Sequence, residues 1–361
     1  MDSLTQFALG AGVGLAVLGR RVGPRRAALA GGILGTLPDL DVLYPFKDPV
    51  DAFVLHRGPT HSLIVQAVAT PLFGEALMRL QGPLRRQRAL TYAAVYLCFA
   101  THALLDALTV YGTRIFWPLW PEPVGIGSVF IIDPLYTVPL LIAVVWALCL
   151  RSWTARFRVG LVVCLGVSSV YLGWGLIAQR MAEARATAVL AERGVEPDRL
   201  LATPTPFNSL LWRAIAIEGS RYFNVYVPLL APRAAATVYA HPHGTGRIGC
   251  IEGIPSATRV ARFSKGFYRL DVEDGEVVVS DLRMGLTPNY VFRFAVAEVG
   301  EGELVAVPPR RVRGLRSADG DLDWLLAGLL GGEAVRLAEA ATAEVDAPRR
   351  ADASGDAQPL C

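Results

Sequence analysis

The stretch VGLVVCLGVSSVYLGWGLIAQ, residues 159–179, decides the fold class because it carries no charged side chain. A helix of about 20 apolar residues is long enough to cross the hydrocarbon core of a bilayer. A second charge-free run covers 134–150, and two further apolar runs, 62–78 and 89–110, are interrupted only by Glu75, His102 and Asp106. With 53% hydrophobic and 19% charged residues, the chain is predicted to be an α-helical integral membrane protein.

The first 40 residues follow a different pattern. Runs 7–19 and 27–38 are apolar but shorter than a full span, and they are separated by Arg20, Arg21, Arg25 and Arg26. We expect a tight hairpin of two short helices, in which recurring glycines let the helices approach closely. The arginines follow the first apolar run, and Asp2 stands where a signal peptide is basic, so we expect this segment to be retained.

The connections between the apolar runs differ in charge. Connections 19–26, 79–88 and 151–158 hold arginines and no acid, whereas 36–61 and 109–133 hold several carboxylates and few bases. The positive-inside rule therefore predicts that the arginine-bearing connections lie in the cytoplasm and the acidic ones outside. Because this rule already accounts for the basic connections, they are not evidence of nucleic-acid binding. We therefore expect no nucleic-acid partner.

The composition changes after about residue 180. Runs 207–230, 235–241, 267–282 and 290–299 are rich in β-branched and aromatic residues and are broken by Gly, Pro, Asn and Asp. The stretch 266–280 alternates around Asp274-Gly275, a strong hairpin signal. His241 and His243 are interpreted as residues of a surface turn.

These patterns predict a domain organisation. We expect a transmembrane helical domain at 1–180, made of the short hairpin and about four spans, and a small β-rich (α+β) domain at 181–320. A C-terminal amphipathic helix at 321–347 and a disordered tail at 348–361 complete the prediction. Because the last span starts at the arginine-bearing connection 151–158, it ends on the opposite face, and the β-rich domain is predicted to be extracytoplasmic.

Histidines and carboxylates gather at the ends of the apolar runs, where they are costly unless they pair or bind a cation. Asp39 and Asp41 follow Pro38, which tends to end the preceding helix, and His56 and His61 flank the turn RGPT. His102 and Asp106 are four apart and share a helix face. The alternatives are a helix cap at Asp39, interfacial histidines, and a His102–Asp106 pair that satisfies itself.

The ligand types indicate the chemistry. Imidazoles combined with carboxylates suit zinc, with manganese or iron as alternatives, and the five cysteines form no C-x-x-C motif. An open site of this kind lowers the pKa of a bound water and polarises a phosphoryl or carbonyl oxygen. We therefore predict a metal-dependent hydrolase of phosphoesters or other esters, small or lipid-linked. The alternative is a non-enzymatic metal transporter or sensor, although a transporter is expected to place its polar groups near the bilayer midplane.

The ordered motifs MDSLTQ (1–6), LPDLD (37–41), HRGPTHS (56–62), THALLD (101–106), YGTRIFWPL (111–119) and IDPLY (132–136) resemble the bacterial membrane-bound metal-dependent hydrolases, the YdjM-like inner-membrane family. The resemblance implies a multi-pass protein of the bacterial cytoplasmic (inner) membrane, in contact with membrane lipids. It also implies a metal centre lined by Asp2, Asp39, Asp41, His56, His61, His102 and Asp106.

Within that set we assign roles. Asp39, His56, His61, His102 and Asp106 are the predicted metal ligands, and Asp41 or Asp2 is the predicted second ligand or general base. Arg57 or Arg114 is predicted to bind an anionic substrate group. Many relatives carry His at the position of Gln6, whose amide oxygen can bind a metal or accept a hydrogen bond from water.

Overall fold

The computed structural model describes residues 1–232, 235–244, 251–300, 304–314, 317–332 and 335–344. Its contacts divide the chain into two compact units. The first unit comprises Met1–Tyr44, Arg57–Ile177 and Pro206–Ser209. The second comprises Pro45–His56, Ala178–Thr205 and the chain from Leu210 onward. The short segment Pro45–His56, which lies between two stretches of the first unit, therefore belongs with the C-terminal part of the chain.

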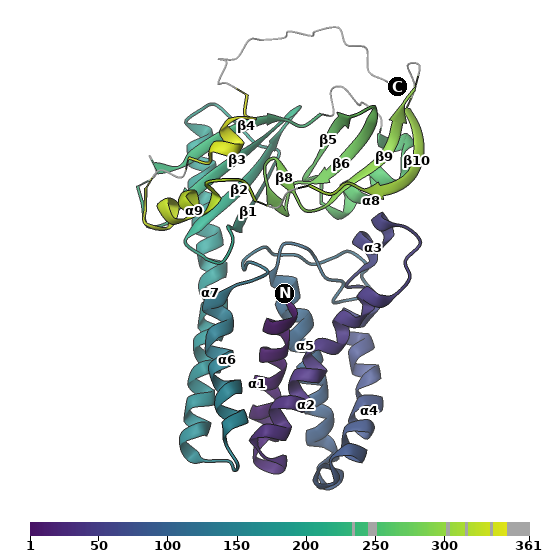
Figure 1. The fold of residues 1–361 in the computed structure, drawn as a ribbon, viewed down its shortest axis with the longest axis vertical. Helices are drawn as coiled ribbons and strands as arrows, with labels where there is room; N and C mark the ends of the chain where they lie inside the picture. Colours follow the sequence, from purple (N-terminus) through teal and green to yellow (C-terminus); the bar gives the residue numbers. More distant parts are fainter. Residues whose placement is uncertain (233–234, 245–250, 301–303, 315–316, 333–334, 345–361) are drawn as a thin grey trace. The chain divides into compact units, whose positions relative to one another are not determined.

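The first unit is a bundle of helices that run up and down (Figure 1). Its helices are α1 (Ser3–Val22), α2 (Pro24–Thr36), α4 (Leu63–Leu80), α5 (Arg88–Leu108), α6 (Pro134–Cys149) and the first part of α7 (Ala155–Ala191). Among the described residues, three helices are long and apolar enough to cross a membrane: α4, α5 and α7. The 16-residue α6 is apolar but shorter. The prediction of a helical membrane region is confirmed, with three candidate spans where about four were expected.

Glycines bring α1 and α2 together as the sequence predicts. The hairpin turns at Gly23, whose φ of +89° is unfavourable for a residue with a side chain. A Cβ atom added at Gly10 would lie 2.4 Å from the Gly31 carbonyl oxygen, and one at Gly14 would lie 2.6 Å from the Ala27 carbonyl oxygen. The two backbones are therefore in direct contact, and a larger residue cannot be placed between them.

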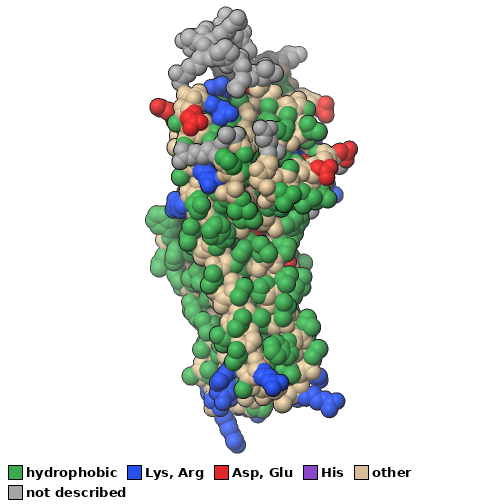
Figure 2. All heavy atoms as spheres, turned by 90° about the vertical axis from the view of Figure 1, so that its left-hand side faces the viewer, with side chains coloured by type: hydrophobic (Ala, Val, Ile, Leu, Met, Phe, Trp, Pro, Cys, Tyr) green, Lys and Arg blue, Asp and Glu red, His purple; other side chains and the backbone are tan. Residues whose placement is uncertain are grey.

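The arginine-bearing connections lie at one end of the bundle. They are the turn after α1, the 3-10 helix η3 (Gly82–Arg86) between α4 and α5, and the short link between α6 and α7. Figure 2 shows blue Lys and Arg side chains at this end and a mostly hydrophobic surface along the helices. The opposite end of the bundle carries the two 3-10 helices η1 (Leu37–Leu43) and η2 (Pro59–His61).

The second unit is rich in antiparallel strands, so the predicted β-rich region is confirmed (Figure 1). One four-stranded sheet has the order β1-β2-β3-β4, formed by Arg199–Pro204, Leu211–Glu218, Arg221–Pro228 and Thr237–Pro242. The other has the order β10-β9-β6-β5, formed by Leu304–Arg311, Arg293–Val299, Glu276–Asp281 and Tyr268–Glu273. A small pair, β7 (Gly285–Leu286) and β8 (Asn289–Tyr290), and the helices α3 (Pro49–Leu55), η5 (Ile251–Gly253) and α8 (Pro255–Phe263) complete this part.

The predicted hairpin at Asp274-Gly275 is present. Strands β5 and β6 pair up to Glu273 and Glu276, and both turn residues have positive φ, +51° and +80°. Two adjacent residues with positive φ fit a type I′ turn, whose backbone twist matches that of the flanking strands. The sequence did not indicate β10, because its run contains the adjacent prolines Pro308 and Pro309; the register shifts between Ala306 and Arg310.

Two expectations about the second unit are wrong. The helix predicted at 321–347 is two short helices, α9 (Asp321–Leu329) and α10 (Leu337–Ala340), because Gly331 turns the chain with φ +83°. Residues 345–347 and the tail predicted at 348–361 lie outside the described residues. His241 and His243 do not form a surface turn, since both side chains are buried and His241 contacts the buried Glu339 carboxylate at 3.1 Å.

Candidate metal centre

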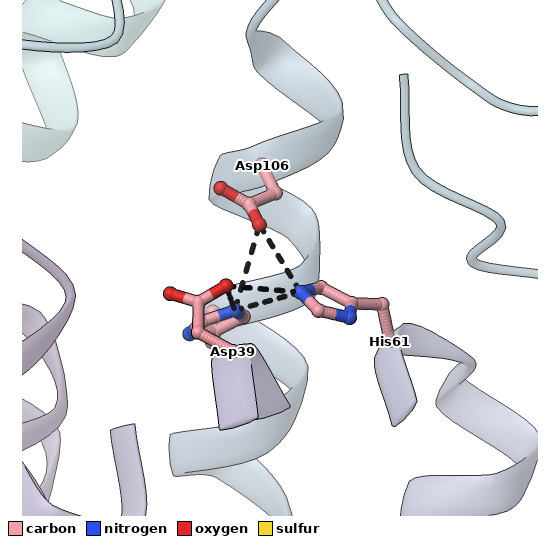
Figure 3. Close-up of side chains that lie close together, drawn as sticks. Asp39, His61 and Asp106 are labelled. Atoms are coloured by element: carbon pink, nitrogen blue, oxygen red, sulfur yellow. Dashed lines mark hydrogen bonds and ion pairs between the residues drawn. The ribbon is translucent and has the colours of Figure 1, made fainter. Parts of the chain in front are cut away.

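The four residues of the candidate site come from three elements of the first unit, and Figure 3 labels three of them, Asp39, His61 and Asp106. Helix α5 supplies His102 and Asp106, which share one face because they are four residues apart. Asp39 comes from η1, which follows α2 and has Pro38 in its first turn. His61 is the last residue of η2, whose first residue is a proline. Each 3-10 helix thus has a proline in its first turn, which fixes φ at that position.

The four side chains meet at their tips. Among the described residues, Asp39, His61, His102 and Asp106 each offer a ligand atom, and these atoms lie within 4.8 Å of one another. The two Nε2 atoms are 3.1 Å apart, and the distances from them to Asp39 Oδ1 and Asp106 Oδ2 are 3.3–3.5 Å. Ligands at 2.0–2.1 Å from a tetrahedral zinc ion would be separated by roughly 3.3–3.4 Å. The spacing therefore fits one ion held by two nitrogens and two oxygens.

Hydrogen bonds on the far side of each ring indicate which nitrogen is free. His102 Nδ1 lies 2.6 Å from the Gly35 carbonyl oxygen, which can only accept, so Nδ1 carries the proton. Thr60 Oγ1 donates to Asp41 Oδ2 at 3.0 Å and therefore accepts from His61 Nδ1 at 2.9 Å. In the neutral form of both rings, Nε2 then presents a lone pair to the site. Such outer hydrogen bonds are typical of metal-bound histidines.

Two buried oxygens at the site accept no hydrogen bond. Among the described residues, none donates a hydrogen bond to Asp106 Oδ2 or Gln6 Oε1, while Gln6 Nε2 donates to Asp106 Oδ1 at 3.0 Å. A buried carboxylate oxygen that accepts no hydrogen bond is costly even beside a guanidinium, and so are two imidazole lone pairs that face each other. A cation among these atoms removes both costs, so the residues present fit a divalent metal ion.

Positive charge also reaches Asp106 from the protein itself. Arg57 Nε lies 3.2 Å from Asp106 Oδ2, and the Met1 amino group pairs with Asp106 Oδ1. Arg57 also donates to Thr109 Oγ1 at 3.2 Å, and its guanidinium lies 4.9 Å from the centre of the Tyr111 ring. Arg57 is therefore a buried, fixed part of the site. Because its side chain is held by these contacts, it is poorly placed to reach out to a substrate.

Asp39 is the ligand with the most exposure. Its side chain is 22% exposed, whereas the other three are at most 1% exposed. Burial opposes its ionisation, but hydrogen bonds donated by His102 and His61 when their rings are protonated outweigh burial and hold the pKa of the Asp39 carboxyl well below its usual range. Asp39 is thus a carboxylate at ordinary pH, available both to an ion and to molecules that approach the site.

The other predicted residues occupy different places. Asp41 stands behind His61, 3.6 Å from Nδ1, and accepts a hydrogen bond from the Arg57 backbone N–H at 3.0 Å. Asp2 caps α1: it accepts from the Leu4 and Thr5 backbone N–H groups and from the Thr5 hydroxyl. A cap explains Asp2 without a metal, so the ligand or base role expected of it has no support in these contacts.

His56 and Arg114 are also outside the group of four. His56 follows α3 in the segment Pro45–His56, which belongs to the second unit. Among the described residues, His56 is not one of the four clustered ligands, although it lies next to Arg57 in the sequence. The Arg114 backbone N–H donates to the Arg57 carbonyl oxygen at 3.1 Å, which ties the stretch after α5 to the turn before η2.

Several contributing residues were not identified from the sequence. The Gly35 carbonyl, the Thr60 hydroxyl and the Thr109 hydroxyl support His102, His61 and Arg57. Thr60 lies inside the quoted motif HRGPTHS, so its position next to His61 was an available signal. The Gly35 carbonyl could not be recognised, because every residue has a backbone carbonyl. Thr109 could be recognised only from the structure, in which it lies next to Arg57.

Comparisons with known proteins agree with the resemblance seen in the motifs. No solved structure matches the chain significantly. The inner membrane protein YbcI of Escherichia coli (strain K12) is 38% identical over 105 residues, which are 29% of this chain and 58% of that protein. The chain thus spans less than two thirds of the curated relative. The sequence profile of the YdjM inner membrane protein family matches residues 1–182, which include the whole candidate metal centre, and the chain belongs to that family.

Proposed function

We propose that this protein is a membrane-embedded, metal-dependent hydrolase that acts on a phosphoester or another ester. The observation that carries the proposal is the buried group of two Nε2 atoms and two carboxylate oxygens at spacings that suit a tetrahedral ion, in which Asp106 Oδ2 accepts no hydrogen bond from the described residues. Zinc fits two nitrogen and two oxygen ligands best, with manganese and iron as alternatives. When bound, such an ion supplies Lewis acidity and lowers the pKa of water.

The protein's own residues prepare the site for this chemistry. Asp41 and Thr60 fix the orientation of His61, and Arg57 offsets the charge of Asp106. Gln6 Oε1 is a buried acceptor next to Asp106, available to a hydroxyl or water in the site. We assign Asp41 an orienting role, and Asp39, as the exposed ligand, is the carboxylate that an incoming molecule meets first.

A lipid-linked substrate fits the surroundings of Asp39. Side chains three residues apart eclipse each other in a 3-10 helix, so Val42 shares the face of Asp39 on η1. Val42 is exposed, and Leu40, Leu43 and Tyr44 beside it are exposed as well. An exposed apolar flank at the end of spanning helices suits contact with membrane lipids. The accessible edge of the site therefore favours an ester carried on a membrane amphiphile.

We also propose an orientation for the protein in the membrane. The arginine-bearing end of the bundle lies in the cytoplasm, by the positive-inside rule. The metal centre then lies at the extracytoplasmic face, and the β-rich part follows the end of α7 on that same side. His102 and Asp106 lie in the last two turns of α5, near one end of the span, which favours a hydrolase over a transporter with a midplane site.

Metal analysis and a substrate screen together test the proposal. We expect purified wild-type protein to bind a divalent ion, His61→Ala and His102→Ala to lose it, and His56→Ala to keep it because His56 lies outside the group of four. Phosphoester and carboxylester substrates are supplied both in solution and in lipid vesicles, and hydrolysis is followed for each variant. Unchanged metal content in His61→Ala and His102→Ala would show that the centre is wrong. Metal binding without hydrolysis of either ester class would leave a metal site and reject the hydrolase.

A further inference from the structure

Arg57 is a cation that the helical bundle holds beside a metal ligand. Its side chain is only 7% exposed, and its Nε atom lies 3.2 Å from Asp106 Oδ2. The Nη1 atom donates to Thr109 Oγ1 at 3.2 Å, and the guanidinium lies over the ring of Tyr111. All four residues belong to the first unit. The position of this charge is therefore set by contacts within that unit.

The backbone of Arg57 is fixed as well. Its φ is +60°, a left-handed conformation that a residue with a side chain adopts only where its surroundings enforce it. The Arg57 N–H donates to Asp41 Oδ2 at 3.0 Å, and the Arg57 carbonyl oxygen accepts from the Arg114 N–H at 3.1 Å. Because the backbone is bound on both sides, the side chain starts from a fixed point beside the end of α5.

The contact between Arg57 and Asp106 is an ion pair without a hydrogen bond. The Nε atom of Arg57 is buried and donates no hydrogen bond to the described residues, and Asp106 Oδ2 accepts none from them. A hydrogen bond needs the N–H group to point at the acceptor, and a short distance alone does not make one. The guanidinium thus offsets the negative charge of Oδ2 and leaves the lone pairs of this oxygen to an ion.

The other oxygen of Asp106 is already occupied. Oδ1 accepts from Gln6 Nε2 at 3.0 Å and pairs with the Met1 amino group. Figure 3 shows one oxygen of Asp106 directed at His61 and the other directed away from it. Two-metal sites hold their ions about 3.5–4 Å apart, so a carboxylate that bridges them needs both oxygens free. Asp106 has one oxygen for an ion, and a fixed cation stands beside that oxygen.

The number of ligands agrees with a single ion. Four clustered side chains, two imidazoles and two carboxylates, suffice for one zinc ion. A second ion would need further ligands nearby, and Asp41 is the remaining predicted carboxylate next to the group. Its Oδ2 atom already accepts hydrogen bonds from the Arg57 N–H and from Thr60 Oγ1.

We propose that Arg57 is the fixed second cation of the metal centre: its guanidinium stands beside Asp106 where a second metal ion would otherwise bind, so the centre holds one divalent ion. This inference rests on the metal centre of the proposed function and sets its ion count. A guanidinium keeps its charge at ordinary pH, and a chelator cannot remove it. The proposed hydrolysis then uses one exchangeable ion and one cation that belongs to the chain.

The test counts ions in the full-length protein in lipid nanodiscs. The protein is incubated with excess Mn²⁺ and freed of unbound ion by gel filtration. Elemental analysis then gives the metal content, and electron paramagnetic resonance shows whether the ions are isolated. Two Mn²⁺ ions at the spacing of a two-metal site are spin-coupled, and their spectrum differs from that of an isolated ion. We expect one isolated ion per wild-type chain.

Variants of Arg57 separate a charge role from mechanical support. Arg57→Met removes the charge and keeps much of the side-chain length, so the content should rise from one ion to two, with a coupled spectrum. Arg57→Lys keeps the charge and should stay at one isolated ion. Arg25→Met is the matched control, because it removes an exposed arginine at the opposite end of the bundle. It should also hold one ion.

The outcomes distinguish the two proposals. A wild-type chain that binds no Mn²⁺ and no Zn²⁺ would reject the metal centre of the proposed function, and the role of Arg57 with it. Two coupled ions in the wild type would leave the centre intact and overturn the role of Arg57. One ion or none in Arg57→Met would overturn it too, since the arginine would then only support Asp106. If Arg57→Met fails to fold, Arg57→Gln replaces it under the same criteria, because its neutral amide keeps a donor for Thr109.

Discussion

His61 is the ligand whose orientation depends most on a chain of polar side chains. Thr60 accepts from its Nδ1 and donates to Asp41, so the carboxylate acts on the imidazole through one hydroxyl. Carboxylates behind metal-bound histidines raise the basicity of the ring and fix its tautomer. The charge of Asp41 is thus part of the centre, although Asp41 is not among the four clustered ligands.

Replacing Asp41 by asparagine should weaken Zn²⁺ binding roughly 10-fold to 100-fold without changing the number of ions bound at saturation. The reason is that the amide keeps the shape of the carboxylate and removes its charge. Chelator competition gives the affinity, and elemental analysis gives the stoichiometry. A complete loss of the ion, equal to that in Asp39→Asn, would make Asp41 a direct ligand and contradict its orienting role.

Asp2→Asn is the corresponding control at the other predicted carboxylate. Asparagine caps helices about as well as aspartate, so α1 should stay capped, and the Zn²⁺ affinity should equal that of the wild type. A weaker Zn²⁺ affinity in this variant would mean that Asp2 takes part in the metal centre as a ligand or base.

For the individual residues, the sequence predicted the four clustered side chains but not the groups that hydrogen-bond to them. His102 and Asp106 could be paired because helical spacing alone puts them on one face. Asp39 follows Pro38, which tends to end a helix, and His61 follows the bend at Gly58 and Pro59. His56 was included because it flanks the same turn as His61. The left-handed backbone at Arg57 and the assignment of α3 to the second unit separate the two histidines, and neither feature can be inferred from residue spacing.

The hairpin of α1 and α2 depends on helix contact through glycine backbones. A methyl group at Gly10 would lie within 2.4 Å of the Gly31 carbonyl oxygen, so Gly10→Ala should force the helices apart. Overpacking of this kind costs about 1–3 kcal/mol. We expect a lower melting temperature in detergent, measured by intrinsic fluorescence, together with weaker Zn²⁺ binding, because α1 carries Gln6.

Gly166→Ala on α7 is the matched control for that substitution. No atom of the described residues lies within 4 Å of a Cβ atom at this position, and alanine is favoured over glycine in a helix interior by about 0.5–1 kcal/mol. The melting temperature should stay the same or rise. Equal loss of stability in both variants would mean that the cost comes from the membrane-exposed helix surface and not from the α1–α2 contact.

Elements with strong local signals were predicted well, and those formed by distant contacts were not. The hairpin at Asp274-Gly275 follows from two adjacent residues with positive φ. Strand β10 contains two prolines and is recognisable only through its pairing with β9. Helices α9 and α10 were predicted as one amphipathic helix, whereas the charged residues Arg336 and Glu339 of this segment are buried by contacts with the sheet that its own sequence does not show.

The whole molecule has a definite expected orientation, which labelling in intact cells can test. A cysteine at Gly82, in the arginine-bearing connection between α4 and α5, should be protected from a membrane-impermeant maleimide. A cysteine at Asp274, in the exposed hairpin turn of the β-rich part, should be labelled in cells with a permeabilised outer membrane. Both variants are made in a background without the five native cysteines. Labelling of position 82 with protection of position 274 would reverse the proposed topology.

The division of the chain at about residue 180 was inferred from a change in composition, and that signal cannot detect an inserted segment. Pro45–His56 is grouped with the second unit because α3 contacts α8 and β10, with Phe53, Asp48 and Asp51 among the contacting residues. Its own sequence looks like an ordinary acidic loop between helices. Only its contacts with residues far along the chain show that it belongs to the second unit.

This arrangement has a consequence for biosynthesis. Asp48 precedes its partner Arg259 by 211 positions, which corresponds to about 10 to 40 seconds of translation at the usual 5–20 residues per second. During that time the clustered ligands have been synthesised and their helices can insert, but α3, in the segment between Asp39 and His61, has not yet met its partners on α8. A nascent or truncated chain that stops before α8 therefore carries every clustered ligand while the Phe53 ring and the carboxylates of Asp48 and Asp51 are without their partners Phe263 and Arg259.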